Sequence, residues 1–290
     1  LSKTLLPDGT EIPGTNFDYN YLQHRKVDVV SSALDFILPF EKYKITAGAK
    51  VSFTNTRNGI NYDTSDPTLV QDDYFRYKEQ IYALYADYSR EFSERFSMQL
   101  GLRMEHTRTT GISEAKDTED KHDYTRLFPT VYLLYSPTDG HALNFSFSNR
   151  ISRPSQNMVN PFPFYQNKYT YACGREDLKP SYTYNAELGY TLKNNFNVSA
   201  YYSYSDDVFF QVVDLDAETN VTSFLWENFM QTHAFGLNNS YTFRTKWLQT
   251  YAQHGVSYRR TTSSAATTSP EEKGWAYNAS LRNTFFFNEK

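Results

Sequence analysis

The chain has 290 residues, a formal net charge of −4 and a mean hydropathy of −0.66, with 25 Tyr and 22 Phe. The acidic balance excludes a general nucleic-acid binder, which needs a basic stripe, and the single cysteine, Cys173, excludes an intrachain disulfide. No run of about 18 apolar residues occurs, so no transmembrane helix is expected. A membrane β-barrel remains possible, because its strands show lipid only every second residue.

The N-terminal part of the chain does not look like a signal peptide. Residues 1–25 lack a basic region followed by an apolar core. We expect that, if the protein is exported, its signal lies upstream of Leu1.

The first half of the chain contains segments in which apolar and polar residues alternate. Alternation of this kind predicts strands with one apolar and one polar face. It is seen at 27–38, 44–54 and 96–107, whereas 74–89 carries apolar residues on both faces and leaves the facing open. In 96–107 one face reads Phe96, Met98, Leu100, Leu102 and Met104, and the other reads Ser97, Gln99, Gly101, Arg103 and Glu105.

The second half continues the same pattern. Residues 142–152, 182–192, 196–204 and 275–287 alternate, 248–260 does so weakly, and 124–135 again leaves the facing open. Alternation also fits a soluble β-sandwich with solvated outer faces. Sandwich strands usually run about 5–6 residues, whereas a tilted membrane strand needs about 9–11. These segments run roughly 10–16 residues, which favours the membrane wall.

The connections alternate between short and long. The short ones fall at 39–42, 90–94, 136–140, 193–195 and 244–246, and the long ones at about 57–73, 109–123, 153–180, 206–222 and 261–274. Outer-membrane barrels have short periplasmic turns and long extracellular loops. We therefore predict an all-β, antiparallel transmembrane barrel with about eleven long meander strands. Because an open sheet edge cannot face lipid, residues 1–290 are expected to form one incomplete barrel segment of a larger barrel.

Four groups of residues in the middle of the chain resemble a known family. They are Arg150, Arg153 and Pro154; Asn160, Pro161 and Phe162; Gly174, Leu178, Lys179 and Pro180; and Glu187, Leu188 and Tyr190. Residues 77–83, 101–105 and 127–129 add further matches. In this order they resemble the outer-membrane β-barrel family of the Bacteroidetes, the barrel part of TonB-dependent receptor-like proteins. Arg175 and Glu176 depart from the family pattern, which has Asn-Pro there.

The resemblance implies a location in the cell outer membrane and a role in transport. It implies a barrel of about 22 strands and a plug or carboxypeptidase-regulatory-like domain upstream of this sequence. The expected partners are membrane lipid, the plug, a TonB-type energy-coupling protein and an unidentified small-molecule or oligomeric nutrient. No nucleic acid is expected among them.

The loop 153–180 is the candidate ligand-binding segment, because it is the longest and most aromatic connection. The candidate contacts are Arg150, Arg153, Phe162, Phe164, Tyr165, Tyr169 and Tyr171. A simpler interpretation is that Pro154, Pro161, Pro163 and Pro180 stiffen a long loop that folds over the barrel. The sequence favours this simpler interpretation.

No other motif indicates a chemical function. Acidic residues cluster at 114–123 and 206–218, but without EF-hand spacing they are expected to be solvated charge and not a calcium site. The six histidines form no His-x-x-x-His pair. Mid-strand Arg103 and Glu105 are expected to tune permeation and not to catalyse a reaction. We expect no enzyme activity, no metal site and no cofactor.

Three functions remain open at the level of sequence. The leading prediction is a TonB-dependent-type receptor that takes up a nutrient ligand. The alternatives are a passive porin-like channel and a surface-exposed structural or adhesion barrel. The sequence does not identify the cargo.

Overall fold

A computed structural model describes residues 6–10, 12, 19–64, 72–114, 116–265 and 269–287. These residues form thirteen strands and one short helix. The elements are β1 Tyr19–Pro39, β2 Tyr43–Thr64, β3 Asp73–Ser93, β4 Phe96–Ser113, β5 Thr118–Tyr135, β6 His141–Ser152, α1 Gln156–Val159, β7 Phe164–Asn167, β8 Thr170–Cys173, β9 Ser181–Leu192, β10 Phe196–Asp216, β11 Val221–Arg244, β12 Leu248–Ser263 and β13 Glu271–Phe285. No helix in the described part of the chain is long and apolar enough to cross a membrane.

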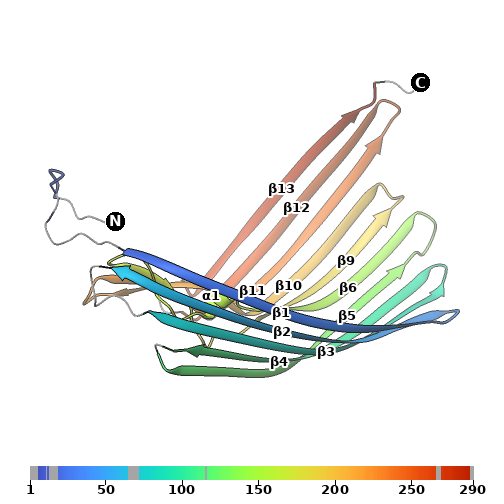
Figure 1. Cartoon of the computed structure of the whole chain (residues 1–290). Helices are drawn as coiled ribbons and strands as arrows, with labels where there is room; N and C mark the ends of the chain where they lie inside the picture. Colours follow the sequence, from blue (N-terminus) through green and yellow to red (C-terminus); the bar gives the residue numbers. More distant parts are fainter. Residues whose placement is uncertain are drawn as a thin grey trace.

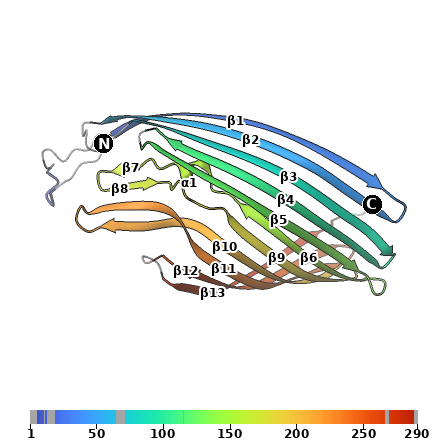
Figure 2. The ribbon, with the colours of Figure 1, turned by 90° about the horizontal axis from the view of Figure 1, so that it is seen from below.

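Eleven strands form one continuous curved wall (Figures 1 and 2). Their order is β1-β2-β3-β4-β5-β6-β9-β10-β11-β12-β13, and every neighbouring pair on this path is antiparallel. This confirms the predicted meander of about eleven strands. The short strands β7 and β8, which the sequence did not predict, lie off the path: β7 pairs with β8, and β8 runs parallel to β11. Within the described residues, β1 and β13 are each paired on one side, so the wall is open.

The two faces of the wall differ in polarity as the alternation predicted. Leu100, Leu102 and Met104 are 39%, 50% and 40% exposed, whereas their neighbours Glu105 and Thr107 are 8% and 0% exposed. The apolar side chains therefore cover the convex outer face, and the polar ones line the concave face. The described strands of the wall form one sheet with no second sheet packed on it, so the sandwich interpretation is wrong.

The structure also assigns the facing of the two strands that the sequence left open. In β3, Phe75 is buried on the concave side, whereas Leu84 is 57% exposed on the outer face. In β5, Phe128 is 6% exposed on the concave side and Leu127 is 54% exposed outside. Apolar residues on both faces are possible here because part of the concave face is itself covered by protein.

The predicted short turns lie together at one rim of the wall, on the right in Figure 1. The predicted long links need correction. Strands β2, β3, β4, β5, β10 and β11 continue through most of 57–73, 109–123 and 206–222. Polar composition indicated loops, but a hairpin that leaves the membrane still satisfies its own backbone groups by pairing. Within the described residues of these links, only 153–180 leave the path of the wall and form short elements of their own.

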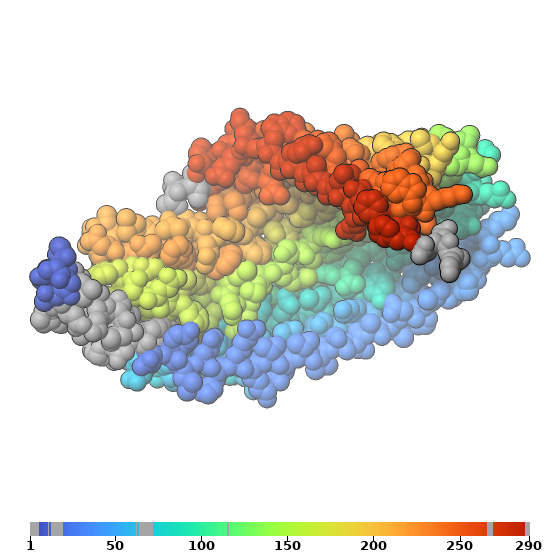
Figure 3. All heavy atoms as spheres, turned by 90° about the horizontal axis from the view of Figure 1, so that it is seen from above, coloured from blue at the N-terminus to red at the C-terminus, as the bar shows by residue number. Residues whose placement is uncertain are grey.

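Residues 153–180, which we call the strap, lie on the concave side at the rim opposite the short turns. Figure 3 looks into this hollow, with β1 in blue on one side, β12 and β13 in red on the other, and the strap in yellow-green between them. The strap fills a notch, because β6 ends at Ser152 and β9 begins at Ser181 while β5 and β10 reach much further. Its core is a buried cluster with two wall strands, made of Ile60, Phe75, Val159, Phe162 and Leu178.

Candidate ligand-binding site

The base of the strap is held by a network of charges around Arg153. Nη2 of Arg153 donates to Oε2 of Glu105 at 2.6 Å and to Oγ1 of Thr107 at 3.2 Å. Nε of the same side chain lies 3.7 Å from Oε1 of Glu79. Glu105 also accepts from Nε of Arg103 at 2.5 Å. Charge-assisted hydrogen bonds of this kind are among the strong ones, so the strap is fastened to β3 and β4.

Burial of the guanidinium works to lower the pKa of Arg153, but its hydrogen bond with Glu105 and the nearby carboxylates outweigh this and raise the pKa above its ordinary value. Arg153 therefore remains charged although it is mostly buried, because its carboxylate partners compensate for the lost hydration.

The far side of the strap is held by β10 and β11. Nη1 of Arg175 lies 2.5 Å from Oε1 of Glu227, and the hydrogen bond of Arg175 with Asp177 raises the pKa of the guanidinium. Asn228 exchanges two hydrogen bonds with the Lys179 backbone, at 2.8 and 2.9 Å. Strand β8 pairs with β11 through residues 170–173 and 222–225. The strap thus connects two parts of the wall that face each other across the hollow.

Arg175 and Glu176, the two residues that depart from the family pattern, both contact the wall in this structure. Arg175 reaches Glu227 on β11, and Glu176 accepts a hydrogen bond from Oγ1 of Thr118 on β5 at 3.0 Å. Both substituted positions therefore link the strap to the wall, one on each side.

The structure separates the predicted ligand contacts into buried and exposed groups. Phe162 is 4% exposed within the strap cluster, and Phe164 packs against that cluster and against the Tyr21 ring at 5.7 Å. The rings of Tyr165 and Tyr171 lie 5.5 Å apart. Tyr169 is 52% exposed. Arg150 is exposed on the concave face of β6, and Arg153 anchors the strap as described above.

A cavity of about 520 Å³ opens on the concave side beside the Arg153 network. Its lining includes Tyr85, Asp87, Arg103, Glu105, Phe128 and Arg150. Arg103 is paired with Glu105, and the Tyr85 hydroxyl donates to Asp35. Within the described residues Arg150 makes no ion pair, so its guanidinium is available in this cavity. The site therefore combines a free cation with aromatic surface.

The sequence did not predict Tyr85, Asp87 and Phe128 as site residues, because the alternation in β3 and β5 did not show which of their side chains point to the concave face. A signal was present in Gly101. A Cβ at this glycine would lie 2.4 Å from both Oδ1 of Asp87 and Oγ1 of Thr130. A glycine in mid-strand often marks a close approach by its neighbours, and here it marks side chains that crowd the concave face.

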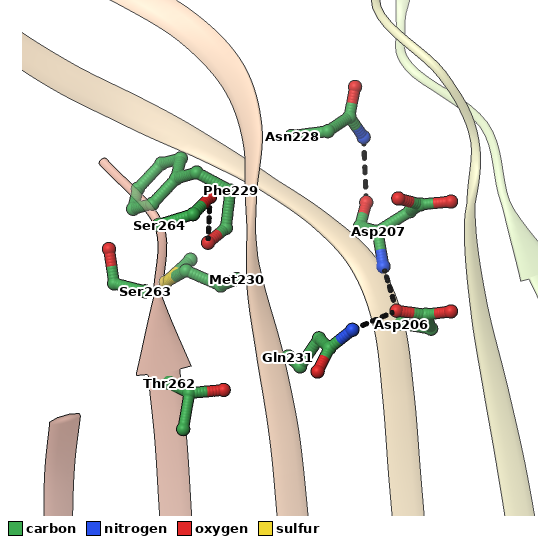
Figure 4. Close-up of a pocket in the computed structure, with 9 residues that line it drawn as sticks. All are labelled: Asp206, Asp207, Asn228, Phe229, Met230, Gln231, Thr262, Ser263 and Ser264. Carbon is green, nitrogen blue, oxygen red and sulfur yellow. Dashed lines mark hydrogen bonds between the residues drawn. The ribbon is translucent and has the colours of Figure 1, made fainter. Parts of the chain in front are cut away.

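A second cavity, of about 280 Å³, lies where β10 and β11 bend (Figure 4). The bend includes a bulge at Asp207, which has φ of 52°. Figure 4 shows Gln231 donating to Asp206, Asn228 to the Asp207 carbonyl, and Ser264 to the Phe229 carbonyl. These groups satisfy one another and stabilise the bend. In the part of the chain that the structure describes, no three His, Cys, Asp or Glu side chains converge to hold a metal ion.

A sequence model described as "outer membrane protein beta-barrel family" matches residues 2–290. A comparison with curated protein sequences returned no significant match.

Several solved structures share the fold. The copper transporter OprC is 11% identical with a TM-score of 0.61, covering 90% of this chain and 48% of its own. A ferric enterobactin receptor of Pseudomonas aeruginosa, PfeA, is 12% identical with a TM-score of 0.54, covering 84% and 40%. The ferric citrate transporter FecA is 11% identical with a TM-score of 0.51, covering 97% and 50%. The chain therefore spans about half or less of the length of these structures.

Proposed function

Because this chain belongs to the outer membrane protein β-barrel family and lies in the cell outer membrane, we propose that it forms part of the wall and the mouth of a TonB-dependent-type transport barrel that takes up a nutrient ligand. The open edges of β1 and β13 require partners where they face lipid. In this proposal further strands of the same protein pair with them, and a plug domain fills the hollow.

The observation that carries the proposal is the strap. A segment of 28 residues is bound inside the hollow, fastened to β3–β5 on one side and to β10–β11 on the other. A ligand that enters the hollow along this part of the rim comes close to the strap. The strap then presents its exposed side chains to the entering ligand, which suits selective uptake.

The proposed ligand contacts are the accessible members of the predicted set. Tyr169 and Arg150 are exposed, and Tyr165 and Tyr171 lie next to Tyr169 on β7 and β8. Phe162 and Phe164 shape the strap beneath them, and Arg153 positions its base. An anionic group on the ligand would pair with Arg150, and tyrosine rings offer large contact area at low entropic cost.

The test uses the intact protein that carries this chain. Growth of a deletion strain on defined nutrients identifies the cargo, and uptake by the Arg150→Gln and Tyr169→Ala variants follows. We expect each variant to raise the half-saturating cargo concentration about tenfold, the effect of one lost charge-assisted or aromatic contact. Arg244→Gln, at the opposite rim, serves as the control and should leave uptake unchanged.

Energy coupling separates this proposal from a passive channel. Uptake that stops when the proton gradient is dissipated supports TonB-type coupling. Uptake that persists, together with a large steady ion current in single-channel recordings, would favour the porin instead. A deletion strain with no uptake defect on any nutrient would favour an adhesion barrel.

A further inference from the structure

Five basic side chains gather on the outer face of β1–β4. Lys26, Arg57 and Arg76 occupy directly opposed positions on β1, β2 and β3. Lys78 lies two residues along β3, and Arg108 lies on β4 opposite Gln80. Because alternate residues of a strand share a face, these positions lie on the same face as Leu84 and Met104. We call Lys26, Arg57, Arg76, Lys78 and Arg108 the basic patch.

The basic patch lies at the margin of the apolar surface of the wall, and on β1 one exposed apolar side chain, Leu22, lies beyond it. Lys26, Arg57, Lys78 and Arg108 are each four residues along their strands from an exposed apolar or aromatic side chain, namely Val30, Phe53, Tyr82 and Met104. Four residues of a strand span about 13 Å, which a tilt of about 45° reduces to about 9 Å along the membrane normal. This places the basic groups at the level of lipid headgroups.

The charge of the patch is only partly compensated. Asp28 lies 3.8 Å from Nζ of Lys26 and 3.6 Å from Nη2 of Arg57, which are long contacts. Asp123 pairs with Arg108 at 2.8 Å. Arg76 and Lys78 have no ion pair among the described residues, and Nε of Arg76 is buried without a hydrogen-bond partner. Positive charge is therefore in excess here, although the whole chain carries −4.

The other end of the wall differs. On the outer face of β12 and β13, beyond Trp275, Arg260 pairs with Glu271, and Lys273 lies 3.7 Å from the same carboxylate. The two basic side chains there share one carboxylate, which leaves one positive charge over, whereas the five of the basic patch share two carboxylates, which leaves three. The excess of positive charge is therefore larger on β1–β4 than on β12 and β13.

We propose that the basic patch binds the phosphate groups of lipid headgroups in the outer leaflet. Arginine recognises phosphate through paired N–H donors, and two neighbouring arginines stand opposite each other here. The side chains point away from the hollow, so a ligand passing along the concave face does not meet them. The anion that reaches this face at this depth is that of a lipid, which in the outer leaflet is a phosphorylated glycolipid.

The experiment uses the intact protein carrying this chain, purified in detergent and mixed with phosphatidylcholine vesicles that contain lipid A or its dephosphorylated form. We expect preferential binding to the phosphorylated form. The triple variant Arg57→Gln, Arg76→Gln, Lys78→Gln should lose about a hundredfold in affinity, since each basic residue near an anionic surface contributes roughly fivefold. The matched control is Arg260→Gln, Lys273→Gln, which should retain binding.

Folding of each variant is checked by comparing the gel mobility of the protein before and after heating. If the triple variant is unstable, the charge-conserving variant Arg57→Lys, Arg76→Lys is used instead and should keep most of the binding. Equal binding to dephosphorylated lipid, or unchanged affinity in the folded triple variant, would overturn the proposal. So would complete competition by inorganic phosphate, since the site would then bind the free anion. Cargo uptake is not needed for this test, so it stands apart from the transport proposal.

Discussion

Arg153 shows how one side chain can determine the position of a whole segment. Its guanidinium shares Glu105 with Arg103 and lies near Glu79. The side chains of Glu105 and Arg153 are 10% and 21% exposed. Without the arginine, two carboxylates would remain close together on the concave face, with only Arg103 to compensate them. The ion pair of Arg153 with Glu105 therefore holds the base of the strap, and removing Arg153 should destabilise this attachment because it leaves the carboxylates poorly compensated.

We predict that Arg153→Ala detaches the strap from β3 and β4. Loss of hydrogen bonds to charged groups costs about 1.5–3 kcal/mol, so the backbone amides of 153–180 should exchange hydrogen faster and proteases should cut this segment. Hydrogen exchange with mass spectrometry, with the protein in detergent, measures this. Lys168→Ala is the control, because Lys168 is an exposed residue of the strap whose side chain makes no ion pair among the described residues. Equal protection of the strap in both variants would contradict the role assigned to Arg153.

At the scale of elements, the strap is built by a close approach of two backbone segments. Helix α1 stops after Val159, and Asn160 is extended with φ of −75° and ψ of 114°, as expected before a proline. The Gly174 amide then donates to the Asn160 carbonyl, and the Arg175 amide donates to the Met158 carbonyl, both at 2.8 Å. This pairing folds the strap back on itself and brings Leu178 to the buried cluster.

We predict that Gly174→Ala disrupts this fold-back. A Cβ at Gly174 would lie 2.4 Å from the Asn160 carbonyl oxygen and 2.5 Å from that of Met158. Both contacts are with backbone atoms, which cannot move aside as the end of a side chain would. The substitution should therefore lower the free energy of unfolding by about 1–3 kcal/mol, as is typical of overpacking. Thermal unfolding and protease sensitivity of the strap measure the effect. Gly274→Ala, where a Cβ meets nothing within 4 Å, should be neutral, and a neutral Gly174→Ala would refute the steric explanation.

At the scale of the whole molecule, the two faces of the wall suit two different environments. Its convex face is apolar between the short-turn rim and the basic patch, and its concave face is polar and partly covered by the strap. Trp275 is 69% exposed on the convex side, whereas Trp226 packs against the strap cluster. These two tryptophans therefore report on opposite environments.

We predict that brominated lipid quenches the fluorescence of Trp275 and not that of Trp226. The intact protein is reconstituted into vesicles as single-tryptophan variants, with the other tryptophans of this chain changed to Phe. Trp275 should lose most of its emission, because an exposed aromatic on the outer face contacts acyl chains or the interface. Strong quenching of Trp226 with no change at Trp275 would reverse the assignment of the two faces.

The sequence by itself determined the wall. A strand shows successive side chains to opposite faces, so the pattern from Phe96 to Met104 was sufficient to predict an apolar outer face, and the short turns predicted the common rim. The Bacteroidetes origin, the plug and the energy-coupling partner stay predictions from the resemblance.

Tertiary structure decided where the strap lies and which predicted contacts remain accessible. Arg153 and Glu105 are 48 positions apart, and Arg175 and Glu227 are 52 apart, so no local pattern records their contact. Phe162 and Tyr169 look alike in sequence, yet one is buried and the other exposed. Alternation is a property of a few neighbouring residues, whereas burial on the concave face depends on which distant segment folds over it.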